Sequence, residues 1–126
     1  MTKKSNLNLR VLLVDDEDDL RETLKEMLEL YGLRVEVAIN GSEAYEKTKN
    51  HIFDLIISDI RMPQSTGVDF LNKLTEDYKK KIPILMVSAY SDYDENSLKR
   101  MGARKLLHKP INMATLLAAI EQVTFK

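Results

Sequence analysis

The sequence predicts an α/β fold in which a doubly wound, five-stranded parallel sheet is covered by helices on both faces. Short apolar runs alternate along the chain with longer segments whose apolar residues recur every three or four positions. The three strongest runs, residues 11–14, 55–57 and 84–87, are almost wholly apolar, which is typical of strands buried on both faces. Strands and helices that alternate in this way form right-handed crossovers and a parallel sheet between two helical layers.

The first half of the chain contains two strand–helix pairs. After the strand at 11–14, one apolar face predicts a helix that ends near Gly32, with the stripe Leu20, Leu24, Met27, Leu28 and Tyr31. Residues 35–39 alternate between apolar and polar side chains, which indicates a strand nearer an edge of the sheet. Asn40 is placed to cap the next helix, and Glu43 stands at the capping-box position.

The second half repeats the alternation three times. The strand at 55–57 precedes a third helical stripe, made of Phe70, Leu71, Leu74 and Tyr78. The strand at 84–87 precedes a short helix with only Leu98 and Met101 in its stripe, and residues 105–108 predict a weaker fifth strand. The last helix has a strong apolar face, formed by Met113, Leu116, Leu117, Ile120 and Val123.

Length and composition indicate one soluble globular domain. We expect residues 1–126 to form a single unit, with a core at about 8–124 and a short N-terminal tail at 1–7. The net charge of −1 gives no field for direct binding of nucleic acid, and the absence of cysteine excludes disulfides and thiolate metal sites. No apolar run is long enough to span a bilayer or to form a signal peptide, so we expect a cytoplasmic protein without membrane insertion.

Chemically active side chains gather where the predicted strands end. Asp15 and Asp16 follow the first strand, Asp59 the third, Ser88 the fourth and Lys109 the fifth. Because the carboxyl ends of parallel strands meet at one edge of the sheet, we expect these side chains to lie together. Three crowded carboxylates are costly unless a cation sits among them. Mg²⁺ suits such a site, since it prefers a few carboxylates together with water and phosphate oxygens.

This combination favours phosphoryl chemistry. With a cation screening its charge, Asp59 can act as a nucleophile toward phosphorus and form an aspartyl phosphate. Phosphoryl transfer depends on stabilising three equatorial oxygens, which Mg²⁺, the Lys109 ammonium and the Ser88 hydroxyl can each contact. Taken singly, the residues have plainer interpretations: a helix-capping acidic turn, a turn-forming aspartate, a surface lysine and a loop serine. Only their joint occurrence at predicted strand ends favours the phosphoryl site.

The motifs resemble the receiver domain of two-component response regulators over nearly the whole chain. They are the pair Asp15-Asp16, the stretch SDIRMP at 58–63 followed by Gly67, the pair Ser88-Ala89, and Lys109-Pro110. The resemblance implies a flavodoxin-like (βα)5 fold with strand order 2-1-3-4-5. It also implies that the peptide bond before Pro110 is cis, as it often is in such families.

The resemblance also implies a role for each site residue. Asp59 is the phosphoryl acceptor, and Ser88 and Lys109 hold the phosphoryl group. Asp16 and Asp59 bind Mg²⁺ directly, Asp15 helps through water, and the backbone carbonyl of Arg61 is a further ligand; Mn²⁺ is a substitute for Mg²⁺.

The implied function is a signalling switch rather than a turnover enzyme. A sensor histidine kinase or a histidine phosphotransfer protein would donate the phosphoryl group, and the chain would catalyse its own modification. Phosphorylation would change a partner-binding surface near the fourth helix, fifth strand and fifth helix, read by an effector protein or by an output domain absent from this chain. Receivers often carry an aromatic residue three positions before the conserved lysine, whereas this chain has Leu106 there.

The residues count against three other functions. An Asp-nucleophile phosphatase uses the same kind of site but usually needs a second acid two residues after the nucleophile, where this chain has Arg61. A flavin or dinucleotide carrier would need a Gly-rich first turn, where Asp15-Asp16-Glu17 would repel a pyrophosphate. A scaffold that works without phosphorylation would have no need of the complete acceptor set.

Overall fold

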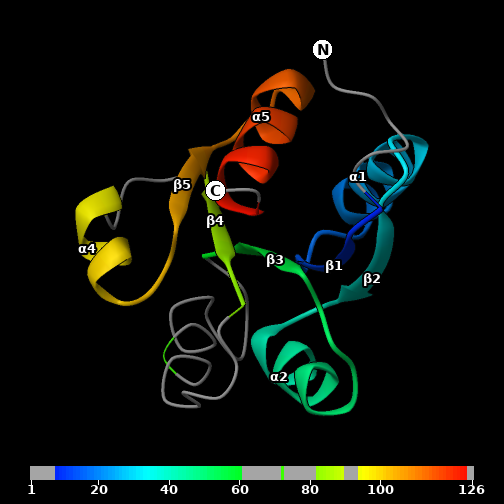
Figure 1. Ribbon diagram of the computed structural model, residues 1–126, viewed down its shortest axis with the longest axis horizontal. Helices are drawn as coiled ribbons and strands as arrows, with labels where there is room; N and C mark the ends of the chain where they lie inside the picture. Colours follow the sequence, from blue (N-terminus) through cyan, green and yellow to red (C-terminus); the bar gives the residue numbers. More distant parts are fainter. Residues whose placement is uncertain (1–7, 61–71, 73–81, 90–93, 125–126) are drawn as a thin grey trace.

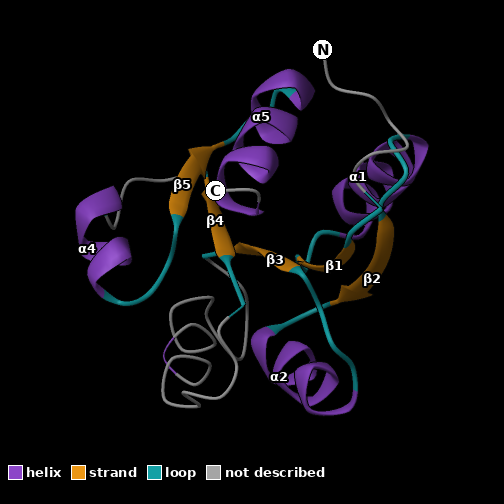
Figure 2. Cartoon of the chain, in the orientation of Figure 1, coloured by secondary structure: helices purple, strands orange, loops and turns teal. Residues whose placement is uncertain are grey.

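The computed structural model describes residues 8–60, 72, 82–89 and 94–124 (Figures 1 and 2). Within them the elements run in the order β1 (Arg10–Val14), α1 (Asp18–Leu30), β2 (Arg34–Ala38), α2 (Gly41–Asn50), β3 (Leu55–Asp59), β4 (Ile84–Ser88), α4 (Glu95–Arg100), β5 (Lys105–His108) and α5 (Met113–Thr124). The predicted alternation of strands and helices is confirmed for these ranges. The helix predicted from Phe70, Leu71, Leu74 and Tyr78 lies outside the described residues.

All five strands pair in parallel, in the order β2-β1-β3-β4-β5. This confirms the predicted fold and strand order. The alternating strand β2 and the weak strand β5 form the two edges, and the apolar strands β1, β3 and β4 occupy the centre. Burial follows this placement, because every residue of β3 and β4 is buried whereas β2 keeps exposed and half-buried positions.

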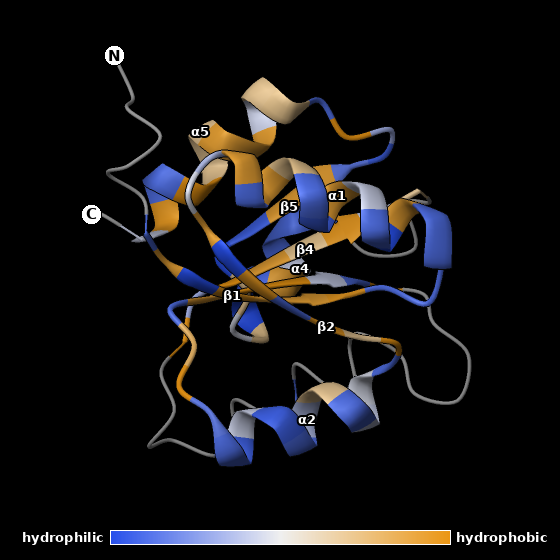
Figure 3. Cartoon of the chain, turned by 90° about the vertical axis from the view of Figure 1, so that its right-hand side faces the viewer, coloured by the Kyte–Doolittle hydropathy of each residue, from blue (hydrophilic) through white to orange (hydrophobic). Residues whose placement is uncertain are grey.

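Two apolar clusters lie on opposite faces of the sheet. Alternate strand residues pack with α1 and α5 on one face, through Leu28 and Leu116 among others. The intervening strand residues pack with α2 and α4 on the other face, through Ala44 and Leu98. Figure 3 shows the mainly hydrophobic strands between α1 and α5 on one side and α2 on the other. No helix in the described ranges is both long enough and apolar enough to cross a membrane.

The helix ends follow local rules that the sequence predicts. Gly32 has φ 90° just after α1, a conformation that glycine adopts without the steric cost of a Cβ atom. Asn40 caps α2, because its Oδ1 accepts a hydrogen bond of 2.8 Å from the backbone N–H of Glu43. The Glu43 carboxylate in turn accepts from the N–H of Ile39, one residue before the cap. The predicted capping pair is therefore present, with its return bond shifted by one residue.

The buried face of α1 differs from the predicted stripe. The structure buries Arg21, Leu24 and Leu28, whereas Met27 is 37% exposed. Arg21 stands three positions before Leu24 and seven before Leu28, so it shares their face of the helix. Hydrophobic periodicity alone missed it because a charged residue is normally assigned to the solvent side.

Helix side chains occupy backbone groups at both edges of the sheet. At the β2 edge, the Lys47 ammonium of α2 donates a hydrogen bond to the carbonyl of Val37. At the β5 edge, the Glu95 carboxylate of α4 accepts a hydrogen bond of 3.1 Å from the N–H of Leu106. Unpaired edge groups can recruit another strand, so these contacts protect the edges and fasten each helix to its strand.

Candidate functional site

The predicted site residues converge at the carboxyl edge of the sheet. Asp15 directly follows β1, Asp59 ends β3, Ser88 ends β4 and Lys109 directly follows β5. The strand register aligns these ends, since Val14 pairs with Ser58 and Ser88 pairs with His108. The parallel arrangement thus gathers side chains that are up to 94 residues apart in sequence, from 15 to 109.

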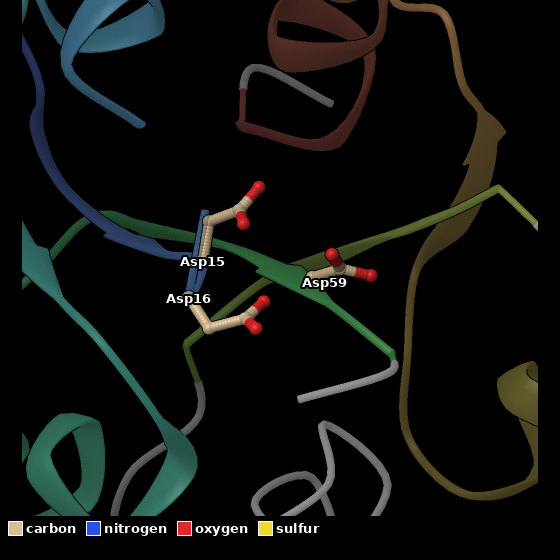
Figure 4. A group of neighbouring side chains, drawn as sticks. All are labelled: Asp15, Asp16 and Asp59. Carbon is tan, nitrogen blue, oxygen red and sulfur yellow. The ribbon is translucent and has the colours of Figure 1, made fainter. Parts of the chain in front are cut away.

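The three carboxylates form one group. One carboxylate oxygen from each of Asp15, Asp16 and Asp59 lies within 4.8 Å of the other two. Figure 4 shows the three side chains as neighbours, with Asp15 and Asp16 at the end of β1 and Asp59 at the end of β3. Asp15 and Asp59 are 3% and 8% exposed, whereas Asp16 is open to solvent.

Among the described residues, Lys109 brings a positive charge into contact with two of these carboxylates. Its Nζ donates a hydrogen bond of 2.8 Å to Oδ2 of Asp59 and lies 3.5 Å from Oδ2 of Asp15. It also lies 3.9 Å from the more exposed carboxylate of Glu17. Burial alone would lower the pKa of Lys109, but the hydrogen bond to Asp59 and the neighbouring negative charges outweigh it, so the pKa is raised.

The Asp15 side chain is held from the next turn of the chain. Its Oδ1 accepts a hydrogen bond of 2.8 Å from the backbone N–H of Glu17. Burial is the largest influence on this carboxyl and raises its pKa, and the charges of Asp59 and Asp16 act in the same direction. The hydrogen bond from Glu17 and the charge of Lys109 oppose the rise without cancelling it.

The donor set fits a hard divalent cation. Three carboxylates approach one another at the open edge of the sheet, and all the ligand atoms are oxygens, the type that Mg²⁺ prefers. Two of the three carboxylates are buried, and the one ammonium of Lys109, which contacts both, does not balance the charge of three carboxylates in a poorly solvated place. A bound cation would offset that charge.

Ser88 ends β4, and Lys109 directly follows the neighbouring strand β5. Ser88 is 3% exposed, and its carbonyl accepts a hydrogen bond of 2.9 Å from the backbone N–H of Lys109. The peptide bond between Lys109 and Pro110 is cis, which confirms that expectation. Arg61, expected to offer a backbone carbonyl to the metal, lies outside the described residues.

Two residues at the site escaped the sequence analysis. Glu17 reaches toward Lys109, although the acidic run suggested only a helix start. Arg21 donates a hydrogen bond of 2.9 Å from Nη1 to the backbone carbonyl of Asp15. The only sequence signal for Arg21 is its place on the same helix face as Leu24 and Leu28.

Comparison with known proteins agrees with this geometry. Residues 11–121 match the family model described as the response regulator receiver domain. The transcriptional regulatory protein CpxR of Escherichia coli K12 is 36% identical over 115 residues, which cover 90% of this chain and 48% of CpxR. The response regulator Rre1 of Synechocystis is 35% identical over 118 residues, which cover 91% of this chain and 51% of Rre1. The chain therefore spans about half the length of these curated relatives.

Solved structures resemble the whole fold. The response regulator TrrA of Thermotoga maritima, crystallised in complex with Mg²⁺-BeF, has a TM-score of 0.82 and 34% identity, covering 91% of this chain and 98% of TrrA. The chemotaxis protein CheY4 of Vibrio cholerae has a TM-score of 0.83 and 36% identity, also covering 91% of this chain and 98% of CheY4.

Proposed function

Since this chain belongs to the response regulator receiver domain family, we propose that it is a switch that accepts a phosphoryl group on Asp59 in a Mg²⁺-dependent reaction. One observation carries the proposal. Asp59 lies within a group of three carboxylates, and its Oδ2 contacts the Lys109 ammonium at 2.8 Å. This arrangement combines a nucleophile, oxygen ligands for a cation and a positive charge within one small site.

The chain's own residues account for the transfer step. A carboxylate oxygen of Asp59 attacks phosphorus, a new O–P bond forms, and the bond to the leaving group breaks with its electron pair staying on that group. Lys109 then shifts from the carboxylate to a phosphoryl oxygen, and the Ser88 hydroxyl donates to another. Burial of Asp59 limits the access of water to the acyl phosphate.

The cation would be held by Asp15, Asp16, Asp59 and the backbone carbonyl of Arg61. When bound, Mg²⁺ neutralises the charge that gathers between the carboxylates and the phosphoryl oxygens. Mn²⁺ would substitute because it favours the same oxygen ligands.

The donor would be a sensor histidine kinase or a histidine phosphotransfer protein. An apolar groove of about 520 Å³ adjoins the acceptor site. Glu17, Ala89 and Lys109 line the end of the groove that is next to this site. The rest of the groove is lined by α1, by the segment between β5 and α5 and by the first residue of α5, through Leu20, Thr23, Leu24, Met27, Pro110, Ile111 and Met113. A donor protein docked over this groove would make apolar contact there during phosphoryl transfer.

The chain would act as a single cytoplasmic receiver unit and catalyse its own phosphorylation without turning over a separate substrate. Its output would pass to an effector protein or to an output domain in a longer chain, in keeping with the greater length of CpxR and Rre1. The chain itself would not bind nucleic acid or insert into a membrane.

Acetyl phosphate tests the acceptor assignment. We expect the wild-type protein to gain the mass of one phosphoryl group with Mg²⁺ and none after chelation, whereas Asp59→Asn gains none. Asp54→Asn is the matched control, because Asp54 precedes β3 at the opposite edge and its carboxylate accepts from the backbone N–H of Arg10. Modification of the control should equal that of the wild type. A mass gain that persists in Asp59→Asn would show that another residue is the acceptor.

A further inference from the structure

Arg21 is a buried cation in α1 whose position hydrophobic patterning does not explain. It is 8% exposed, and its guanidinium makes two hydrogen bonds on the side of the acidic loop. Nη1 donates to the carbonyl of Asp15 at 2.9 Å, and Nη2 donates to the Asp18 carboxylate at 2.7 Å. The buried Nε has no hydrogen-bond partner among the described residues and lies 3.7 Å from the Glu22 carboxylate.

Burying a guanidinium with an unsatisfied donor costs free energy that a methionine or leucine at this position would not. The hydrogen bond to the Asp15 carbonyl offers a structural reason for burying Arg21. Asp15 is the first residue after β1, where the chain leaves the sheet and turns into α1. Its N–H donates to the carbonyl of Ala38 on β2 at 3.1 Å, and its side chain accepts from Glu17. Arg21 binds the remaining polar group of Asp15, its backbone carbonyl.

Asp16 depends on this loop more than Asp15 does. Its side chain is exposed, and within the described ranges it forms no hydrogen bond that would fix its direction. The position of its carboxylate is therefore set by the backbone between Asp15 and Glu17. Arg21 restrains that backbone because it donates a hydrogen bond to the carbonyl of Asp15, the residue before Asp16.

We propose that Arg21 is a positioning residue for the divalent-cation site, which acts through the Asp15 carbonyl to hold the Asp15 and Asp16 carboxylates in a metal-binding arrangement. The inference rests on the proposed function, since it concerns the same cation site. Preorganised ligands bind with less loss of conformational freedom, so releasing the loop should weaken cation binding.

The sign of the effect separates positioning from electrostatics. Arg21 is a permanent positive charge in contact with the Asp15 backbone carbonyl, so its charge alone opposes the binding of Mg²⁺ at the adjoining carboxylates. Removing that charge would strengthen binding if electrostatics were the whole effect. Removing the restraint weakens binding. A purely structural role in packing α1 would change thermal stability and leave the dissociation constant of the folded protein unchanged.

Calorimetric titration with Mg²⁺ alone tests the proposal without phosphorylation, and the absence of tryptophan from the chain makes calorimetry the suitable method. We expect Arg21→Met, which keeps an apolar stem, to raise the dissociation constant three- to tenfold. Arg21→Lys keeps the charge but replaces the forked donor, so it should raise the constant at least twofold and less than Arg21→Met does.

Arg104→Met is the matched control. The Nη1 atom of Arg104 also donates to a backbone carbonyl, that of Val123 at 3.4 Å, but at the far end of α5. The Mg²⁺ dissociation constant of Arg104→Met should equal that of the wild type. An unchanged or lower constant in Arg21→Met would overturn the inference. If that variant fails to fold, an unchanged constant in Arg21→Lys would overturn it, because geometry alone differs there.

The wild-type titration distinguishes the two proposals. Absence of Mg²⁺ binding to the wild-type protein would remove the basis of the proposed cation site itself. Binding to the wild type with equal affinity in Arg21→Met would leave the proposed function intact and remove only the role of Arg21.

Discussion

Asp15 and Lys109 lie at the same acidic edge, and folding raises the pKa of both. For Asp15 the main cause is burial, which disfavours the carboxylate. For Lys109, burial disfavours the ammonium and lowers the pKa, but the hydrogen bond to Asp59 and the charges of the surrounding carboxylates raise the pKa by more. Both shifts favour the more positively charged form of the group. In the metal-free state the site is therefore short of positive charge, as expected for a place that receives a cation.

The direction of the Asp15 shift gives a stability prediction. The pKa of the Asp15 carboxyl lies above 3.8 in the folded protein, because burial disfavours the ionised form. The folded protein therefore loses the stability contributed by the protonated carboxyl as the pH rises through the folded pKa. We expect Asp15→Asn, which keeps the acceptor for the Glu17 N–H, to raise the melting temperature of the metal-free protein at pH 7 by a few degrees. The gain should disappear below pH 3.8, where Asp15 is protonated in both states.

The same substitution removes a carboxylate from the cation site. Saturating Mg²⁺ should therefore stabilise the wild type more than Asp15→Asn, and the difference in melting temperature should shrink or reverse. Thermal melts with chelator and with Mg²⁺ measure both effects. A lower melting temperature for the metal-free variant at pH 7 would contradict the inferred cost of the buried charge.

Among the helices in the described ranges, α4 is the shortest and has the fewest buried residues. It has six residues, and Leu98 is its only buried side chain. Asp94 caps its start, and the hydrogen bond from Leu106 to Glu95 ties its first turn to the outer edge of β5. Leu106 occupies the position where many receivers carry an aromatic residue, and here its side chain packs into the core beneath α4. The hydrogen bond of its N–H adds a second link between the strand and the helix.

Glu95→Ala should loosen that link. The Leu106 N–H would lose its carboxylate partner at the sheet edge, a change worth about 0.5–1.5 kcal/mol for an ordinary hydrogen bond. We expect hydrogen exchange of the Leu106 amide to accelerate about tenfold, while central β3 amides such as Ile57 keep their protection. Glu95→Gln retains an acceptor oxygen and serves as the control. Equal exchange rates for Leu106 in the wild type and Glu95→Ala would show that the contact does not hold the edge.

For the whole molecule, one sheet separates two apolar clusters that share every strand but differ in their helices. A strand cannot keep its hydrogen bonds if the residues on one of its faces lose their packing. The two clusters should therefore unfold together, as one cooperative unit, which is also what the proposed single domain requires.

Leu28→Ala and Leu98→Ala test this coupling from opposite faces. Both side chains are fully buried, so each truncation should lower the free energy of unfolding by about 2–5 kcal/mol. We expect each variant to show one transition in urea, coincident by circular dichroism and tyrosine fluorescence. A separate early transition in Leu98→Ala would mean that the α2 and α4 face is an independent unit.

Local sequence determined the element types, their order and the strand ends that carry Asp15, Asp59, Ser88 and Lys109. These follow from hydrophobic periodicity and capping chemistry, which depend on neighbours only a few residues away. The edge position of β2 was also predicted, from its alternating pattern, whereas the weak apolar pattern of β5 predicted a strand and not its place in the sheet. This much was predictable because buried strands need apolar side chains on both faces.

Tertiary structure alone decided which polar groups meet. The burial of Arg21 beneath Asp15, the contact of Lys109 with both Asp15 and Asp59, and the hydrogen bond from Leu106 to Glu95 all join separate elements. Periodicity assigns a side chain to a face but does not specify the partner on the facing element. A buried polar group is stable only where its hydrogen bonds are satisfied, and those partners come together only when the sheet and its helices have packed.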